Sequence, residues 1–156
     1  MDDNNFIRLV DLEKIDSKKY SFYGIESIVL TFNRKILLQQ RDEDWNRFGG
    51  YLTAFGGGIE KDELPIEALI RELKEELGAR VEKKDVVMLG AITEKVTKYS
   101  ELIYCYFWHD RYKTITGCYE GNPRYYDTVQ DVFHHPKIMD ALRWELKECK
   151  KRGLLK

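Results

Sequence analysis

The stretch GGGIEKDELPIEALIRELKEELGA, residues 56–79, sets three glycines before a loop and then gathers glutamates on a predicted helix. From Pro65 onward, apolar residues recur at the spacing of one helix face. The residues that form this stripe are Ile66, Leu69, Ile70, Leu73 and Leu77. Gly78 follows the last of them, as glycine often does where a helix ends. The pattern therefore predicts an amphipathic helix that begins at Pro65 and stops at Gly78.

Carboxylates crowd one side of this predicted helix. Glu72, Glu75 and Glu76 share an arc of about 100° beside the apolar stripe. Like charges at these spacings repel one another by about 0.2–0.5 kcal/mol per pair. Arg71 and Lys74 could offset the repulsion, as cations do on many solvated helices. A divalent cation is the alternative, because Mg²⁺ takes carboxylate oxygens, water and substrate phosphates as ligands.

The spacing of the whole stretch resembles the Nudix box, GX5EX7REUXEEXGU, where U is aliphatic. The matching residues are Gly57, Glu63, Arg71, Glu72, Glu75, Glu76 and Gly78, with Ala79 at the last position. In that family the box is a loop, helix and loop that binds Mg²⁺ or Mn²⁺ and hydrolyses nucleoside diphosphates linked to another moiety. The resemblance implies an α/β fold, a Nudix-type α/β/α sandwich with a mixed β-sheet.

The same resemblance implies roles for single residues. Glu72, Glu75 and Glu76 would be catalytic carboxylates and metal ligands, and the carbonyl of Gly56 would be a further ligand. Glycine suits that position because a Cβ would keep the backbone away from metal and phosphates. The residues that would orient the loop and helix are Gly57, Glu63, Arg71 and Gly78. An ordinary surface cation is the alternative for Arg71.

Two positions depart from the usual box. Leu64 stands before Pro65 where many relatives carry Ser or Thr, so a side-chain N-cap worth about 1 kcal/mol is missing. Ala79 is smaller than the usual Ile, Val or Leu, which predicts looser packing below the site. We expect the chemistry to survive both changes.

A second resemblance covers residues 102–126, LIYCYFWHDRYKTITGCYEGNPRYY. It is similar to the aromatic strand and loop of MutT-type nucleoside triphosphate pyrophosphohydrolases, in which the Glu of Glu-Gly-Gln-Pro is a metal ligand. Glu120, in EGNP, is the counterpart and is predicted to be catalytic and to bind metal. A solvated acid in a turn is the alternative. Glu94 and Glu101, at the ends of preceding strands, are rivals for the role.

The rest of the chain predicts a sheet with helices on its faces. Strands are expected at 27–32, 35–41, 51–55, 86–92 and 102–112, the last of them central in the sheet. Asn33 and Arg34 predict a hairpin turn between the first two. Residues 114–126 are expected to form a loop, and 138–149 a second amphipathic helix.

Composition bounds the classes of protein. A length of 156 residues with 43% hydrophobic residues predicts one domain, and the resemblance to the Nudix box implies that residues 1–156 form a single Nudix domain. Because 26 Lys and Arg balance 27 Asp and Glu, a bulk nucleic-acid partner is not expected. The acidic first residues and the lack of an apolar run of roughly 18 residues predict a cytoplasmic protein that does not bind membranes.

Cysteine and histidine do not form a metal pattern. Cys105, Cys118 and Cys149 lack CxxC spacing, so neither a zinc site nor a disulfide framework is expected. His134 and His135 have no Cys or carboxylate pattern nearby in sequence. We interpret both histidines as loop residues.

Arg41 and Tyr51 are the candidate substrate-binding residues, for phosphate or base contact and for stacking. Trp45 and Phe48 could also stack on a base, although loop aromatics equally often cover the core. MutT-type enzymes read a guanine-like base with an Asn near the final helix, where this chain has Lys137. That difference argues against specificity for oxidised guanine.

The sequence thus predicts a Mg²⁺- or Mn²⁺-dependent pyrophosphohydrolase acting on a small-molecule nucleotide. A nucleoside triphosphate, cleaved to monophosphate and pyrophosphate by metal-activated water, is the first expectation. ADP-ribose, a nucleotide sugar or a dinucleoside polyphosphate is the alternative. A non-catalytic nucleotide-binding module is a further alternative, although such modules tend to lose box carboxylates. Several relatives are dimers, which leaves a homodimer open.

Overall fold

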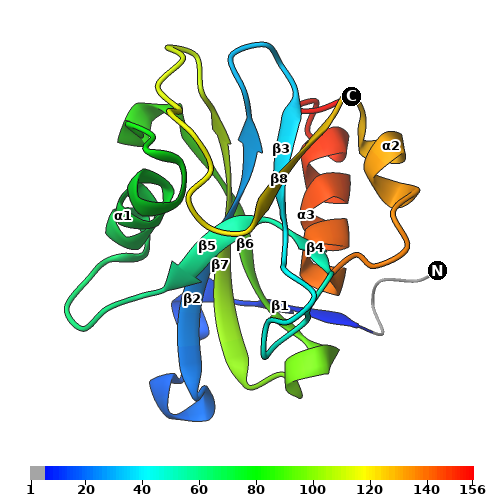
Figure 1. Cartoon of the computed structure of the whole chain (residues 1–156). Coiled ribbons are helices and arrows are strands. Elements are labelled where there is room, and N and C mark those ends of the chain that lie inside the picture. Colours follow the sequence, from blue (N-terminus) through cyan, green and yellow to red (C-terminus); the bar gives the residue numbers. More distant parts are fainter. Residues whose placement is uncertain (1–5) are drawn as a thin grey trace.

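A computed structural model of the protein describes residues 6–156. The acidic opening residues 1–5, on which part of the expected localisation rested, lie outside the described residues. A mixed β-sheet lies between two helical layers (Figure 1). Helix α1 (Pro65–Leu77) covers one face, whereas α2 (Val129–Phe133) and α3 (Asp140–Lys151) cover the other. The predicted α/β sandwich is confirmed.

The sheet has the strand order β1-β6-β7-β2-β3-β4, with β5 paired to β2 and β8 paired to β3. The strands are β1 (Ile7–Val10), β2 (Phe22–Leu30), β3 (Ile36–Gln40), β4 (Leu52–Thr53), β5 (Phe55–Gly58), β6 (Val86–Glu94), β7 (Glu101–His109) and β8 (Asn122–Tyr126). Short 3-10 turns lie at Leu12–Lys14, Ser17–Lys19, Lys83–Asp85 and Lys95–Thr97. Strands β2 and β7 are parallel and the other pairs are antiparallel. The aromatic strand β7 is central, as predicted.

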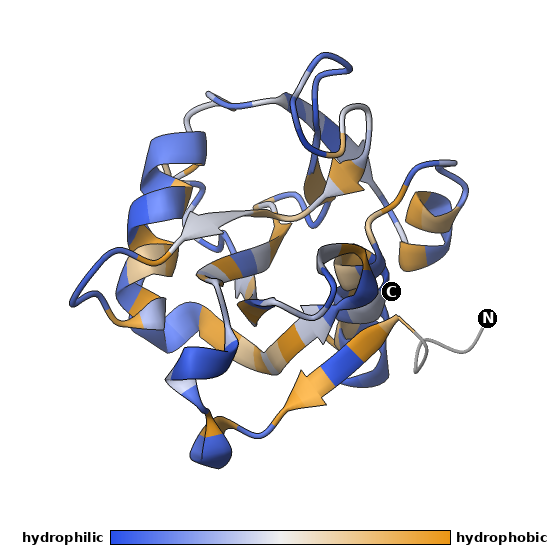
Figure 2. Cartoon of the chain, turned by 90° about the horizontal axis from the view of Figure 1, so that it is seen from below, coloured by the Kyte–Doolittle hydropathy of each residue, from blue (hydrophilic) through white to orange (hydrophobic). Residues whose placement is uncertain are grey.

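Each face of the sheet has its own apolar core. Leu69, Leu73 and Leu77 of α1 pack against Ile25 and Trp108 on one face. On the other face, the buried residues of α3 and the sheet include Leu142, Leu146, Ile28, Ile92 and Phe107. Figure 2 shows hydrophobic and hydrophilic segments alternating along the helices and strands. No helix among residues 6–156 is long and apolar enough to cross a membrane.

Several predicted boundaries differ from the structure. The hairpin turn spans Thr31–Lys35, where the Thr31 amide donates to the Lys35 carbonyl at 2.9 Å. The strand expected at 51–55 is two strands, β4 and β5, and the glycines at 56–58 belong to β5. They pair with β2 in the register that sets Glu26 opposite Gly56.

Two further differences concern missed elements. The loop expected at 114–126 ends in strand β8, so that part of the prediction is wrong; β8 is a largely exposed edge without alternating apolar residues. Strand β1 and helix α2 were not predicted, because four or five residues carry too little periodicity. The predicted helix at 138–149 is α3, shifted by two residues at each end.

Candidate active site

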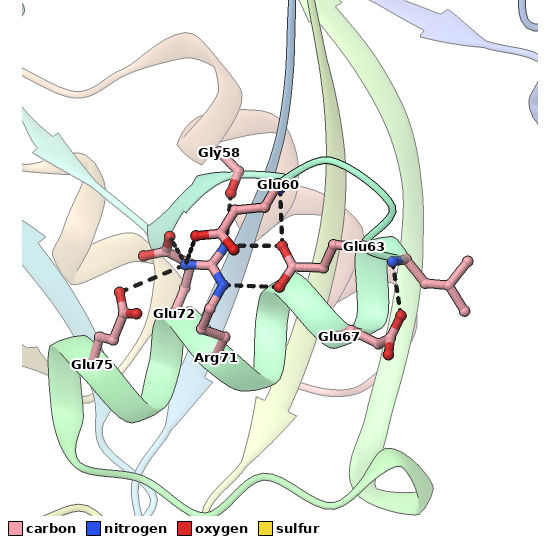
Figure 3. Close-up of polar contacts among 8 residues, drawn as sticks. Gly58, Glu60, Glu63, Glu67, Arg71, Glu72 and Glu75 are labelled. Atoms are coloured by element: carbon pink, nitrogen blue, oxygen red, sulfur yellow. Dashed lines mark hydrogen bonds and ion pairs between the residues drawn. The ribbon is translucent and has the colours of Figure 1, made fainter.

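Arg71 joins the glycine-rich loop to helix α1. Its guanidinium donates to both carboxylate oxygens of Glu63, at 2.8 and 2.9 Å, and to the Gly58 carbonyl at 2.9 Å. It also donates to Glu72 at 2.7 Å and lies 3.6 Å from a carboxylate oxygen of Glu75 (Figure 3). Hydrogen bonding to Arg71 lowers the pKa of Glu63 to about 2. These contacts pin strand β5 and the following loop to the helix, and a mere surface cation would not make them.

Glycine at position 57 lets the loop approach the helix. A Cβ there would lie 2.5 Å from the carboxyl group of Glu72, nearer than real Cβ contacts come. Because Arg71 already holds that carboxylate, Glu72 has little freedom to move aside. Gly57 therefore sets the distance between the β5 backbone and the helix carboxylates.

The two ends of α1 are capped differently. At its start, the amide of Leu64 donates to Glu67 at 2.9 Å, and the Leu64 side chain makes no cap, as predicted. At its end, Gly78 has a φ of 64°. The small Ala79 is fully buried in the α1 core. Its full burial gives no sign of the looser packing that its small size predicts.

The last turn of α1 also holds the loop that carries Glu120. The amide of Tyr119 donates to the Glu76 carbonyl at 2.8 Å, and the amide of Thr116 donates to the Leu77 carbonyl at 2.9 Å. On the other side, the Gln39 side chain donates to the carbonyl of Glu120 at 2.8 Å. The loop is thus fixed between helix and sheet beside Glu76.

Glu76 is the buried carboxylate of the site. It is 2% exposed, and neither carboxylate oxygen has a hydrogen-bond partner within residues 6–156. Burial, with repulsion from Glu120 and from Glu72, raises the pKa of Glu76 to about 10, and the nearby backbone of Gly56 offsets only part of that rise. Such a group needs a cation or a proton, since an isolated buried carboxylate is very costly.

The four predicted carboxylates lie within electrostatic reach of one another. Burial and repulsion from Glu72 and Glu75 raise the pKa of Glu120, whereas Arg41 lowers it. Glu75 is the most accessible of them, with a side chain that is 60% exposed. The proximity of Glu120 to the helix carboxylates therefore agrees with the structure. Of its rivals, Glu101 pairs with Arg47 at 3.1 Å, and Glu94 accepts from the Ala141 amide at 3.3 Å.

The donor set fits a hard divalent cation, although it is not closed around one. No group of three or more His, Cys, Asp or Glu in the described part of the chain has the arrangement of a metal site. Arg71 takes up part of the carboxylate charge in its place, through Glu72 and Glu75. The two unpartnered oxygens of Glu76 are the observation that favours a cation, which carboxylates prefer when water is excluded.

A pocket opens beside these residues, between strands β2, β5, β6 and β7. Arg41, Glu120, Gly56 and Gly57 line it, as does Phe48. The pocket joins one predicted substrate contact, Arg41, to the predicted metal centre.

The other predicted substrate contact lies elsewhere. Tyr51 is partly buried and packs on the core beside Phe48, with ring centroids 6.4 Å apart; it is not among the residues that line the pocket, and its stacking role stays a prediction. Trp45 stacks with the Arg41 guanidinium, 4.3 Å from its ring centre. Lys137 lies 3.9 Å from Glu43, and its amide donates to the ring of His135. His135 and Lys137 both lie in a loop, as expected for His135.

Sequence reasoning missed two buried acids, Glu26 and Glu145, and considered Glu94 only as a rival of Glu120. Glu26 and Glu94 line the pocket, and Glu145 of α3 lies behind Glu26. Two signals in the sequence were available. Glu26 interrupts a run of strand-forming residues, and Glu145 falls on the apolar stripe of α3 between Leu142 and Leu146.

Comparison with known proteins agrees with this geometry. Residues 23–145 match the NUDIX domain family. The m7GpppN-mRNA hydrolase NUDT17 of Xenopus laevis is 37% identical over 67 residues, which are 43% of this chain and 23% of that protein. The chain thus matches less than a quarter of that curated relative's length.

Solved structures give the same fold. The MutT protein from Methanosarcina mazei Go1 has a TM-score of 0.71 at 16% identity, over 88% of this chain and 99% of that one. The NUDIX domain of Shewanella oneidensis NrtR, complexed with ADP ribose, has a TM-score of 0.65 at 19% identity, over 91% and 96%. Since the family match covers most of the chain and includes the whole loop and helix of the site, the chain belongs to the NUDIX domain family of hydrolases.

Proposed function

We propose that the protein is a Mg²⁺- or Mn²⁺-dependent pyrophosphohydrolase of small-molecule nucleotides. A nucleoside triphosphate, cleaved to a monophosphate and pyrophosphate, is the first substrate class. The observation that carries the proposal is the buried Glu76, with both carboxylate oxygens unpartnered among the described residues, beside Glu72 and Glu120. No covalent nucleophile is needed in this scheme.

The residues of the chain divide the work. Glu72, Glu75, Glu76 and Glu120 would hold the cation, together with the Gly56 carbonyl. The bound ion would neutralise the phosphates and lower the pKa of a water molecule. Arg41, which lines the pocket together with Glu120 and Phe48, would bind a phosphate oxygen.

Positioning falls to the residues around the carboxylates. Arg71 would keep Glu72 on the β5 side of the helix through its 2.7 Å hydrogen bond, and Glu63 would fix Arg71. Gly57 would admit the phosphates close to the backbone, and Gly78 would turn the chain toward the Glu120 loop. This division of labour makes Arg71 a positioning residue, because it contacts the ligands rather than the substrate.

A second substrate class deserves testing beside the first. The NUDIX domain of NrtR was solved with ADP ribose, and the NUDT17 relative is named as a hydrolase of capped mRNA. Both ligands contain a phosphoanhydride, so the same carboxylates could act on them. ADP-ribose, nucleotide sugars, dinucleoside polyphosphates and a cap dinucleotide therefore belong in one panel with the triphosphates. No partner of bulk nucleic acid is proposed, and the protein could act as a monomer or a homodimer in the cytoplasm.

The first experiment is a product analysis. Purified protein is incubated with each compound and Mg²⁺, and the products are separated by chromatography. Monophosphate plus pyrophosphate from a triphosphate supports the first class, and cleavage only of an X-linked diphosphate moves the proposal to the second. Absence of metal-dependent turnover on every compound would contradict the enzymatic function and favour a nucleotide-binding module.

Variants then separate Glu120 from its rival Glu94. The Glu120→Gln enzyme should need roughly tenfold more Mg²⁺ for half-maximal activity, because one carboxylate ligand is lost. The Glu94→Gln enzyme should keep the wild-type Mg²⁺ requirement, whatever its effect on substrate affinity. If the two variants behaved in the opposite way, Glu94 would replace Glu120 in the site.

A further inference from the structure

The second acid group lies under the pocket, on the α3 side of the sheet. Glu145 is fully buried, and its carboxyl oxygens have no N–H or hydroxyl donor within the described residues; its partners are the carboxyl group of Glu26 and the thiol of Cys105. One oxygen of Glu26 is buried and unpartnered within residues 6–156. Glu94 is 5% exposed, and one of its oxygens accepts from the Ala141 amide at 3.3 Å. The Ala141 amide therefore satisfies Glu94 in part, and Glu26 and Glu145 share a hydrogen bond between their carboxyl groups.

The three acids form one group together with a thiol. Glu26 lies opposite Cys105 in the β2–β7 pairing, and Glu145 interacts with Glu26, Cys105 and Glu94. Burial raises the pKa of Glu26, although a hydrogen bond with Glu145 and the charge of Arg41 lower it in part. Burial and repulsion from Glu26 raise the pKa of Glu145 and bring that of Glu94 to about 8. The group therefore holds protons as well as lone pairs at neutral pH.

Hydrogen-bond acceptors outnumber donors in this group in any protonation state. A carboxylic acid offers one O–H and several lone pairs, a carboxylate offers lone pairs alone, and a thiol is only a weak donor. Buried acceptors without donors are unfavourable, so the group favours a ligand that brings N–H donors. An anionic phosphate would be repelled from the same place.

The shape of the pocket makes two of these acids reachable. Glu26 and Glu94 line it, and the apolar residues Ile103, Met139 and Phe48 line it with them. The polar side chains of Gln39, Arg47, Thr53 and Glu101 complete the lining. Apolar side chains beside polar groups suit a flat heterocycle. Arg41 and Glu120 line the same pocket and mark the end where phosphates and metal would lie.

We propose that Glu26 and Glu94 hold the edge of a nucleobase that carries an exocyclic amino group. The amino group donates to the two carboxyl groups, and Glu145 supports Glu26 from behind. The phosphates then point toward Arg41 and the helix carboxylates. Adenine, cytosine and guanine fit this subsite, whereas uracil and hypoxanthine present a carbonyl oxygen in place of the amino group and fit it less well. The inference rests on the proposed function, because it assigns the base end of the same substrate.

The test is equilibrium binding, which does not depend on turnover. Non-hydrolysable α,β-imido triphosphates of adenosine, cytidine, guanosine, uridine and inosine are titrated by calorimetry in the presence of Mg²⁺. The amino-bearing nucleotides should bind roughly tenfold more tightly than those of uridine and inosine, which is the usual effect of leaving buried polar groups unpaired. Adenosine against inosine is the sharpest pair, since the two bases differ only in that inosine has a carbonyl oxygen in place of the 6-amino group and an N–H at position 1.

Two variants and a matched control assign the effect to the acids. Glu26→Met and Glu94→Met should each remove most of the preference between amino-bearing and carbonyl-bearing bases. Glu82→Met, at an exposed acid outside the pocket, should keep it. Thermal unfolding distinguishes a residue of the base subsite from a residue that only supports the fold. A subsite residue leaves the melting temperature unchanged or higher when replaced by Met, because a buried unpaired acid opposes folding. A structural residue lowers the melting temperature and leaves the preference intact.

Each outcome decides between the two proposals. Equal affinity for all five nucleotides, or tighter binding of uridine and inosine, would overturn the base subsite while leaving hydrolysis untouched. A clear preference with no product from any compound would retain the subsite and refute the enzymatic function. Should either Met variant fail to fold, Glu26→Gln and Glu94→Gln, which keep the size of the side chain, replace it in the same titrations. An unchanged preference in a folded Met variant would refute the assignment. Failure of all five to bind would also overturn the subsite.

Discussion

The replacement of Glu76 by Gln should stabilise the metal-free protein while it destroys metal-dependent activity. Glu76 has a pKa of about 10 in the folded protein and 4.5 when unperturbed. Because its folded pKa is raised, its protonated form favours the folded state fully below pH 4.5, and this stability is lost as the pH rises toward about 10. At pH 7 the folded protein must keep a proton that the unfolded chain releases, which costs about 3 kcal/mol. Gln mimics the neutral acid without this cost.

The measurement is urea unfolding in EDTA at about pH 5, 7 and 9, followed by tryptophan fluorescence. The difference in unfolding free energy between Glu76→Gln and wild type should grow with pH, by about 1.4 kcal/mol per unit at most. Glu82→Gln, at an exposed acid, should show no such trend. A difference that is constant with pH, or a variant less stable at every pH, would refute the account of a buried, unpartnered carboxyl group.

Three other outcomes follow from the same geometry. Added Mg²⁺ should raise the melting temperature of wild type and leave that of Glu76→Gln nearly unchanged; equal shifts in a thermal scan would place the ion elsewhere. Gly57→Ala should reduce kcat/KM by roughly 100-fold with little loss of stability, because the new Cβ would lie 2.5 Å from the Glu72 carboxyl, and steady-state kinetics with an unaltered value would contradict that contact. Gly78→Ala should lower stability by about 1–2 kcal/mol in chemical unfolding, since its φ of 64° strains any residue with a Cβ; a neutral result would show that the turn relaxes.

The sequence predicted best the elements that repeat a strong period. Helix α1 begins at Pro65 and ends before Gly78 because an apolar stripe, a proline at the first turn and a terminal glycine all agree. Strand β8 could not be predicted in this way, since its partner β3 lies far away in sequence and Pro123 argues against a strand. Pairing at an edge depends on tertiary contacts that local propensity does not encode.

The site divides along the same line. The spacing of Glu63, Arg71 and Glu72 in the sequence was enough to predict that they lie together, because local geometry fixes the residues of one loop and helix. The second acid group comes from three separate elements: Glu26 from β2, Glu94 from β6 and Glu145 from α3. Their proximity depends on the strand order, which the sequence does not show locally. Tyr51 shows why aromatic residues are ambiguous in sequence, because it packs partly on the core beside Phe48, which lines the pocket.

The register between β2 and β5 connects the two acid groups. Alternate residues of β2 face opposite sides, so Ile25 packs in the α1 core, while Glu26 meets Glu145 of α3. Gly56 lies opposite Glu26 in the pairing, and a Cβ at Gly57 would meet Glu72 on the α1 side. A slip of one residue would turn Glu26 toward α1 and separate it from α3. The glycines of β5 therefore do more than admit a phosphate. Without side chains, Gly56 and Gly57 line the pocket between Glu120, beside α1, and Glu26, which interacts with Glu145 of α3.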